Sequence, residues 1–216
     1  MRHRTNWLRR LRAGVIAILG SLAALGSLAC LAVAAEEDAW AFDPEHTRVR
    51  ITWDHLGVSR QSARIEKLYG ALAFSPTEPE AGRVEATLIA RSLSSGVPAL
   101  DRALHSADFF DVERHPHITF RSSVVKAKTD KTGAVSGDLT VRGITRPVTL
   151  EVIWNFTGEH PLASFNPVYA GKWVAGFSAR AVIKRGEFGM TLAAPLVSDE
   201  VVIEIEAEFL RRIATP

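Results

Sequence analysis

Two histidines, His115 and His117, are separated by a single residue at the start of an alternating apolar segment. Residues two apart on a strand point to the same side, so the two imidazoles can share a metal ion with a third histidine, such as His55 or His105. Pro116 constrains this spacing, and no third ligand is fixed by the sequence. We therefore keep a metal-dependent enzyme as an alternative hypothesis and assign no metal ion to the chain.

Aromatic residues are the main candidates for ligand binding, because they are spread over most of the strands predicted below. An apolar cavity for a hydrocarbon chain needs such a lining, and an ordinary packed core uses the same residues. The candidates for a cavity lining are Trp53, Phe74, Phe109, Phe120, Trp154, Trp173, Phe177 and Phe188. Arg142 and Arg146, in a predicted hairpin loop, can meet an anionic head group, with solvated loop charge as the alternative.

Other motifs of catalysis are missing from the sequence. It contains no serine in a nucleophile elbow and no glycine-rich phosphate loop. Asp101, Asp108 and Asp111 lie near a predicted corner, where we interpret them as caps and turn residues rather than as a general acid and base. We therefore predict no catalytic residue, no cofactor and no enzymatic activity.

The segment from His105 to Arg121 holds the most distinctive local pattern. Phe109 and Phe110 stand between two aspartates, and neighbouring side chains of an extended segment point to different sides. Such a pair is buried on both sides only where the backbone enters a fold. Pro116 then favours an extended backbone and a defined strand start. We expect a loop that plugs into the core, followed by a strand.

The first 35 residues have the composition of a secretory signal peptide. Five arginines and no acid precede Ala13, and residues 13–35 carry no charge and end in small residues. An uncleaved membrane anchor is the alternative. Lipidation at Cys30 is disfavoured, because Ser27 to Cys30 is a poor lipobox and apolar residues continue beyond it. Cleavage would remove Cys30, the only cysteine, and leave a single domain of residues 36–216 without a disulfide.

The basic character of the chain resides in this leader. It contains five of the 26 basic residues and none of the 24 acidic ones, so its removal changes the formal net charge from +2 to −3. A mildly acidic domain gives no reason to expect nucleic-acid binding.

Apolar residues alternate with polar ones from Trp40 onward, which predicts strands. We count about eight strands and one short helix, and no βαβ alternation. Eight antiparallel strands close naturally into an up-and-down barrel without free edges. The main strand signals lie at 49–53, 68–74, 84–91, 118–126, 135–141, 148–156, 173–184 and 201–209, and the helix at 97–104.

Three local expectations can be checked against the structure. Strands 137–141 and 148–152 should form a hairpin through Arg142 to Pro147. Gly70, inside an apolar run, suggests a bulge or a bend at a barrel corner. Residues 60–67 are polar and mixed, and are compatible with a short helix or a loop.

The chain resembles the YceI-like family of bacterial periplasmic polyisoprenoid-binding proteins, over nearly all of residues 40–209. The resemblance rests on six motifs taken in order. They are Asp43-Pro44-x-His46-Thr47, Trp53-x-His55-Leu56-Gly57-x-Ser59, Ser106-Ala107-Asp108-Phe109-Phe110-Asp111 to Pro116, Phe120-x-Ser122, Gly137-Asp138-Leu139-Thr140-x-x-Gly143-x-Thr145-x-Pro147-Val148-x-Leu150, and Phe188-Gly189-Met190. Two stretches depart from the family pattern: Leu100–His105 keeps only the Asp and Leu of Arg-Asp-x-His-Leu-Arg, and Ala63-Arg64-Ile65 replaces the usual Gly-x-Phe.

The resemblance implies an all-β, lipocalin-like antiparallel barrel that binds lipid. The expected ligand is a polyisoprenoid, a quinone or a similar long-chain amphiphile, with its tail in the barrel and transient membrane contact. The expected location is the periplasm, with inner-membrane anchoring as the alternative. A metal-dependent enzyme and a membrane-anchored partner-binding domain remain the other hypotheses.

Overall fold

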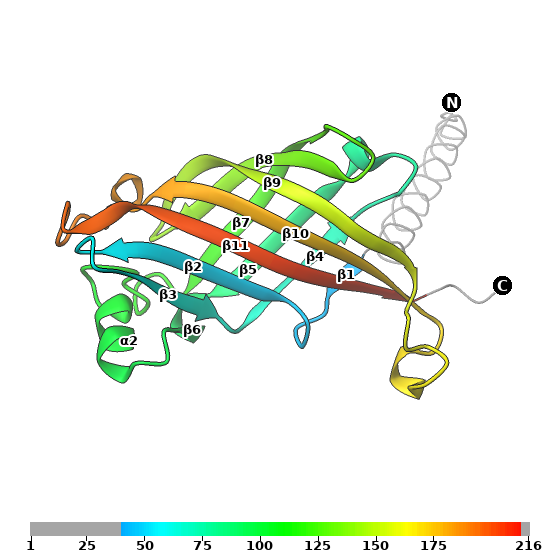
Figure 1. Cartoon of the computed structure of the whole chain (residues 1–216), viewed down its shortest axis with the longest axis horizontal. Coiled ribbons are helices and arrows are strands. Elements are labelled where there is room, and N and C mark those ends of the chain that lie inside the picture. Colours follow the sequence, from blue (N-terminus) through cyan, green and yellow to red (C-terminus); the bar gives the residue numbers. More distant parts are fainter. Residues whose placement is uncertain (1–39, 213–216) are drawn as a thin grey trace, which may run out of the picture. The chain divides into compact units, whose positions relative to one another are not determined.

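The alternating pattern produces a domain built almost wholly of antiparallel strands (Figure 1). The structure is a computed structural model that describes residues 40–212, so the predicted leader lies outside the described residues. The strands are β1 (Trp40–Phe42), β2 (Arg48–His55), β3 (Ser59–Ile65), β4 (Leu68–Ala73), β5 (Arg83–Ile89), β6 (Leu93–Ser94), β7 (His117–Ala127), β8 (Thr132–Val141), β9 (Ile144–Glu159), β10 (Lys172–Lys184) and β11 (Val197–Arg212). The helices are α2 (Pro98–His105) and the short 3-10 turns η1 (Pro79–Ala81), η2 (Ala90–Ser92), η3 (Pro167–Tyr169) and η4 (Arg185–Phe188).

Eight strands close the barrel in the order β1-β4-β5-β7-β8-β9-β10-β11, with β11 returning to β1. The closure is short: Ala41 and Phe42 pair with Leu210 and Phe209 of β11. Along the rest of the same edge, β11 pairs with β2, from which β3 and β6 continue. The predicted eight-stranded barrel with one short helix is therefore confirmed, with an extra β2–β3–β6 ribbon beside it.

Helix α2 has the start and the buried face that its sequence predicts. Pro98 occupies its first turn, where a missing N–H costs nothing, and Leu104 is buried. The Asp101 carboxylate accepts hydrogen bonds from the Ser95 N–H at 2.6 Å and from the Ser94 hydroxyl at 2.9 Å. Asp101 thus organises the loop before the helix as a turn residue, while the N-cap position is held by Val97 without a side-chain hydrogen bond.

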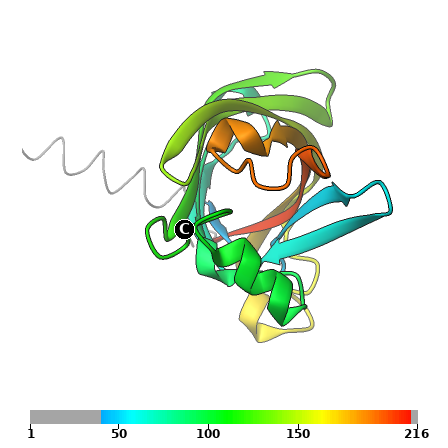
Figure 2. The same ribbon diagram turned by 90° about the vertical axis from the view of Figure 1, so that its left-hand side faces the viewer.

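The corner after α2 also forms, but Phe109 and Phe110 are half-buried rather than fully buried. The Phe110 N–H donates to the Leu104 carbonyl at 2.9 Å, and the Asp111 N–H donates to the Ser106 carbonyl at 2.8 Å, so the Phe-Phe pair folds back onto the helix. Strand β7 begins directly after Pro116. Figure 2 shows α2 and the β10–β11 connection (orange) across this end of the barrel, which we call the α2 end.

The predicted β8–β9 hairpin is present, but its turn is tighter than expected. Val141 pairs with Ile144, so only Arg142 and Gly143 form the turn and Pro147 lies within β9. Both turn residues have positive φ, 53° and 72°. This is the geometry of a type I′ turn, whose twist matches that of the strands.

Residues 60–67 were predicted as a helix or loop, and this prediction is wrong. Ser59–Ile65 forms β3, which pairs with β2 along its whole length. Only Ala63 and Ile65 of this strand are buried. The strand forms because β2 offers hydrogen-bonding partners, a determinant that the apolar pattern of β3 does not contain.

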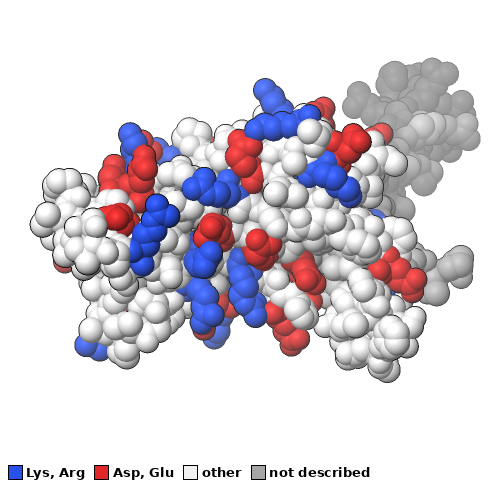
Figure 3. Space-filling view, viewed as in Figure 1, with Lys and Arg blue, Asp and Glu red and all other residues white. Residues whose placement is uncertain are grey.

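The outer face of the barrel carries intermingled charges, as Figure 3 shows. An example is the ion pair between Arg50 on β2 and Glu204 on β11, which are cross-strand neighbours with nitrogen and oxygen 2.8 Å apart. None of the helices in residues 40–212 is long and apolar enough to cross a membrane.

Two strand glycines allow close approach of neighbouring backbones. A Cβ atom on Gly70 would lie 2.0 Å from the Glu85 carbonyl oxygen, yet the β4–β5 register is regular, so no bulge forms here. A Cβ atom on Gly137 would lie 2.3 Å from the Arg121 carbonyl oxygen. Gly137 faces Ser122, where the β7–β8 register shifts and the sheet bends.

We expect Gly137→Ala to lower the free energy of unfolding by about 1–3 kcal/mol, because β7 and β8 must move apart to admit the methyl group. Denaturant unfolding measures the change. The matched control is Gly176→Ala, on β10, where the nearest neighbour of an added Cβ would be Asn155 at 3.9 Å. Equal stability loss in both variants would contradict the close-approach explanation.

The link between β1 and β2 is fastened to β11 by polar contacts. The Asp43 N–H and the Thr47 hydroxyl both donate to the Glu208 carbonyl. Asp43 is buried and accepts hydrogen bonds from the His46 ring and the Glu45 N–H, both at 2.9 Å. Burial alone would raise the pKa of Asp43, but these hydrogen bonds lower it overall. The hydrogen bond to Asp43 raises the pKa of His46.

This pair predicts a pH dependence of stability. A raised histidine pKa stabilises the fold fully below the unfolded value of 6.5, and the contribution is lost as pH rises through the folded pKa. The melting temperature of the parent protein should therefore exceed that of His46→Gln at about pH 6, and the gap should narrow by about pH 9. His117→Gln, an exposed histidine on β7, is the control. A gap that stays constant with pH would refute the linkage.

Candidate ligand-binding site

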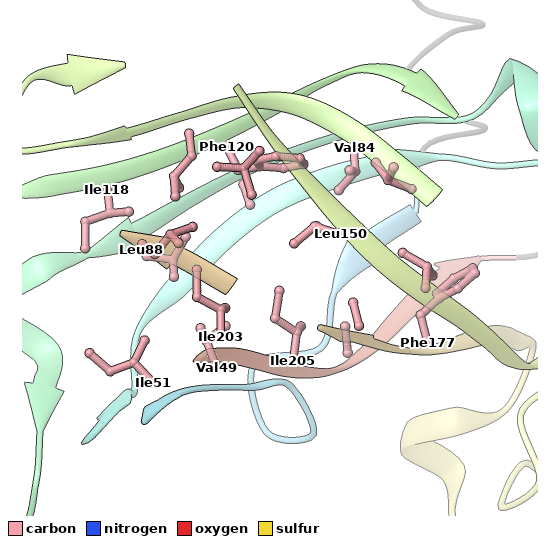
Figure 4. Close-up of a pocket in the computed structure, with 18 of the residues that line it drawn as sticks. Val49, Ile51, Val84, Leu88, Ile118, Phe120, Leu150, Phe177, Ile203 and Ile205 are labelled. Atoms are coloured by element: carbon pink, nitrogen blue, oxygen red, sulfur yellow. The ribbon is translucent and has the colours of Figure 1, made fainter. Parts of the chain in front are cut away.

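The barrel encloses a cavity of about 720 Å³. Its walls come from strands of the barrel and from β2 of the adjoining ribbon, and their apolar side chains converge on one space in Figure 4. The side chains labelled there are Val49 and Ile51 of β2, Val84 and Leu88 of β5, Ile118 and Phe120 of β7, Leu150 of β9, Phe177 of β10, and Ile203 and Ile205 of β11.

Strand alternation explains why the cavity is apolar while the outer face is charged. On β11, Ile203 and Ile205 line the cavity, whereas Glu204 pairs with Arg50 outside. The same alternation on every strand of a closed sheet collects apolar side chains inside and polar ones outside. A volume of this size falls in the range of roughly 300–1,000 Å³ typical of small-molecule sites.

The cavity runs from the α2 end to the opposite end, which we call the β7–β8 end. At the α2 end its lining includes Leu100, Leu104, Phe109 and Phe110. At the β7–β8 end it reaches the connection between β4 and β5 and the turn between β7 and β8, residues 128–131. The β4–β5 connection contacts the end of β7, since the Ala127 N–H donates to the Glu80 carboxylate at 3.0 Å.

Three aromatic rings narrow the β7–β8 end. Phe74 lies edge-to-face with Trp154, with ring centroids 5.3 Å apart, and with Phe177, at 5.2 Å. The Trp154 indole N–H donates to the Thr157 hydroxyl at 2.7 Å, which fixes the ring orientation. The rings therefore present a fixed apolar surface beside the polar turn.

Six of the eight predicted lining residues meet in this cavity. They are Trp53, Phe74, Phe109, Phe120, Trp154 and Phe177. Trp173 and Phe188 lie outside its lining. Phe188, in η4, is fully buried in the main core, and Trp173 packs against a separate cluster around Trp40. Aromatic composition alone does not separate these two packing roles.

The two arginines predicted to meet a head group also lie outside the lining. Arg142 donates to the Gly189 carbonyl at 3.2 Å, and Arg146 donates to the carbonyl of its neighbour Thr145 at 3.0 Å. Both arginines are thus engaged with the backbone, in the β8–β9 turn and just beyond it.

Arg185 is a lining residue that sequence analysis missed. It is 4% exposed, and its guanidinium donates to the carbonyls of Ser198, Met190 and Val197 at 2.9, 2.6 and 2.9 Å. Burial lowers its pKa, against the opposing effect of the Asp199 carboxylate. These hydrogen bonds hold the β10–β11 connection over the α2 end. The only sequence signal was an arginine directly after a predicted strand.

The histidines considered as metal ligands are dispersed. The His115 ring lies 3.9 Å from the Asp111 carboxylate and beside the β8–β9 turn, while His117 is exposed on β7. Among the described residues, one group of three potential metal ligands has its ligand atoms within 4.8 Å of one another. The group consists of Asp43, His46 and Glu208. There the Asp43 and His46 side chains already form a hydrogen bond.

Comparison with known proteins gives consistent matches. A UPF0312 protein of Pseudomonas putida strain F1 is 34% identical over 161 residues, which cover 74% of this chain and 78% of that protein. Burkholderia cenocepacia BcnA has a similar solved structure, with a TM-score of 0.68 and 21% identity over 77% of this chain and 98% of that chain. A solved polyisoprenoid binding domain from Saccharophagus degradans matches with a TM-score of 0.57 and 11% identity, over 79% of this chain and 97% of that chain.

The family itself is settled by sequence. The family model described as the YceI-like domain matches residues 40–209, which include all of the barrel strands up to Phe209. With this match, the chain belongs to the YceI-like family.

Proposed function

We propose that this chain is a lipid-binding protein that holds a long-chain, isoprenoid-like amphiphile inside its barrel. The observation that carries the proposal is the 720 Å³ cavity, lined predominantly by apolar side chains. Its shape suits an extended hydrocarbon tail, because it follows the barrel from α2 to the β7–β8 turn.

The binding energy can come from the tail alone. Each CH₂ group transferred from water to an apolar environment contributes about 0.8 kcal/mol, so a chain of many carbons can bind tightly without a specific hydrogen bond. The aromatic rings of Phe74, Trp154 and Phe177 add a preformed apolar surface at one end. A preformed cavity also reduces the ordering cost that binding must overcome.

The comparisons support this assignment at the level of the fold. The Saccharophagus degradans domain with the same fold is described as polyisoprenoid binding, and we extend lipid binding to this chain by proposal. A polyisoprenoid or a quinone is the proposed ligand. We also propose export to the periplasm, as the composition of residues 1–35 suggests, and transient membrane contact for loading.

Catalysis is not part of the proposal. The chain belongs to a family of binding domains, and the geometry around His115 and His117 gives the metal-dependent alternative no further support. The function follows instead from the cavity.

Filling the cavity should block binding without unfolding the barrel. Ala179, on β10, lines the cavity, so Ala179→Phe should place a ring where the tail lies. We expect the affinity for farnesol to fall about tenfold or more, which corresponds to lost burial of about two CH₂ groups. Displacement of the neutral fluorophore N-phenyl-1-naphthylamine measures this affinity.

The matched control is Val182→Phe on the same strand, where Val182 is 46% exposed and does not line the cavity. Farnesol should bind this variant as it binds the parent protein. If Ala179→Phe stays folded and binds farnesol normally, the ligand does not occupy the barrel.

The natural ligand can be identified directly. We expect native mass spectrometry of the protein, purified from the cells that produce it, to show a mass above that of the chain, and organic extraction to release a prenyl lipid or quinone. A protein that is empty, and that also fails to take up farnesol in solution, would refute the lipid-binding proposal. The same spectrum reports whether residues 1–35 have been removed.

A further inference from the structure

Two neighbouring segments at the α2 end expose apolar side chains to water. The β2–β3 turn and the β10–β11 connection (orange) lie together there in Figure 1, and the Leu56 N–H donates to the Leu196 carbonyl at 2.8 Å. Val58 is 82% exposed and Leu196 is 65% exposed. The exposed apolar residues, which we call the apolar tip, are Leu56, Val58, Leu192 and Leu196. Single apolar residues are common on protein surfaces, but such a group marks an interaction site.

The two segments also lack charge. Residues 56–59 read Leu-Gly-Val-Ser and residues 191–196 read Thr-Leu-Ala-Ala-Pro-Leu, and every residue of both segments is exposed. This end of the molecule, on the left in Figure 3, is largely white, whereas charges of both signs cover the barrel wall. The apolar tip therefore suits a partner whose own surface or interior is apolar.

Both segments are held in a fixed shape. The Asp54 carboxylate accepts a hydrogen bond from the Gly57 N–H at 2.7 Å, and the Val197 N–H donates to the Ala193 carbonyl at 2.9 Å. Leu56 has a φ of 63°, a conformation that glycine and asparagine adopt with less strain. A leucine here favours neither the turn geometry nor solubility, which points to a role in binding.

The apolar tip begins where the cavity lining ends. His55 of β2 and Val197 of β11 are cross-strand partners, and both line the cavity. The next residues along the two segments, Leu56 and Leu196, belong to the apolar tip. The cavity wall thus continues directly into the exposed surface. A ligand that is poorly soluble in water needs such continuity between the site that holds it and the phase that supplies it.

We propose that the apolar tip inserts into the surface of a zwitterionic phospholipid bilayer and docks the α2 end of the barrel there for exchange of ligand. This inference rests on the proposed lipid-binding function and names the partner. Apolar side chains that move from water to the boundary of the acyl chains supply the binding energy. Asp54 and Arg60, cross-strand partners of opposite charge, flank the turn, and a zwitterionic head group carries one charge of each sign.

A second exposed apolar group provides the matched control. It lies in the β9–β10 connection and consists of Leu162, Phe165 and Val168. None of residues 155–176, all of which the structure describes, lines the cavity. This group therefore has the exposure of the apolar tip without its continuity with the cavity.

Flotation with phosphatidylcholine vesicles measures docking. We expect the parent protein to float with the vesicles, and salt at about 1 M to leave the bound fraction intact, since screening weakens only the attraction between charges. Val58→Glu/Leu196→Glu should lower the partition coefficient about tenfold or more, because two apolar side chains are lost and two carboxylates resist burial. Phe165→Glu/Val168→Glu should float as the parent does. All four positions are exposed, and circular dichroism checks that each variant is folded.

Uptake of farnesol separates docking from the cavity itself. The affinity for farnesol in solution, measured by displacement of N-phenyl-1-naphthylamine, should be the same in the parent protein and in both variants. The rate of farnesol uptake from phosphatidylcholine vesicles should fall only in Val58→Glu/Leu196→Glu, in proportion to its loss of docking.

Each contrary outcome has a distinct meaning. If the parent protein does not float, or if Val58→Glu/Leu196→Glu floats equally well, the docking assignment is wrong while lipid binding stands. If only Phe165→Glu/Val168→Glu loses the vesicles, the β9–β10 connection docks instead. A dimer that Val58→Glu/Leu196→Glu dissociates, in a protein that ignores vesicles, would assign the apolar tip to a second copy of the chain. If farnesol fails to bind in solution, the proposed function itself fails.

Discussion

The barrel wall is a single closed sheet, and closure forces one face of every strand to point into the same enclosed space. Successive residues of a strand face opposite ways, so this constraint sorts the whole sequence into an apolar interior and a polar exterior. Ile203 and Ile205 point inward while Glu204 lies outside with Arg50. Eight strands enclose more volume than these side chains fill, which leaves the cavity. The binding site is thus a property of the strand number as much as of any individual residue.

The two ends of the cavity have different chemistry, and this difference gives the site a direction. At the α2 end, Leu104 and Phe110 pack against the core, and buried Arg185 secures the β10–β11 connection through backbone carbonyls. At the β7–β8 end, a turn with exposed lysines lies next to aromatic rings. An amphiphile has the same division between an apolar and a polar part. The asymmetry of the barrel ends therefore matches the asymmetry of the proposed ligand.

The fold was largely predictable because period-two alternation is a local property of the sequence. The strands around Ile51, Phe120 and Ile205 were found in this way, and Pro98 and Leu104 identified the helix. Strand β3 was missed, because it has only two buried residues, Ala63 and Ile65, and depends on pairing with β2. Its hydrogen-bonding partner is set by tertiary structure, which composition does not report.

The site was predictable in kind but less so in detail. Six aromatic candidates line the cavity, whereas Phe188 packs in the core and Trp173 in a second cluster. Lys131, which lines the cavity beside Trp154, was not predicted, because the direction of a turn side chain depends on the register of the two strands it joins. That register shifts between Ser122 and Val124, through a bulge that no sequence pattern predicted.

Closure of the barrel joins Ala41 to Leu210, so the first and last strands of the domain are direct neighbours. Such a contact has a high loop-closure entropy and a high contact order, which slows the folding of sheets. The cavity is therefore complete only when both ends of the domain have met, and ligand binding depends on this long-range contact.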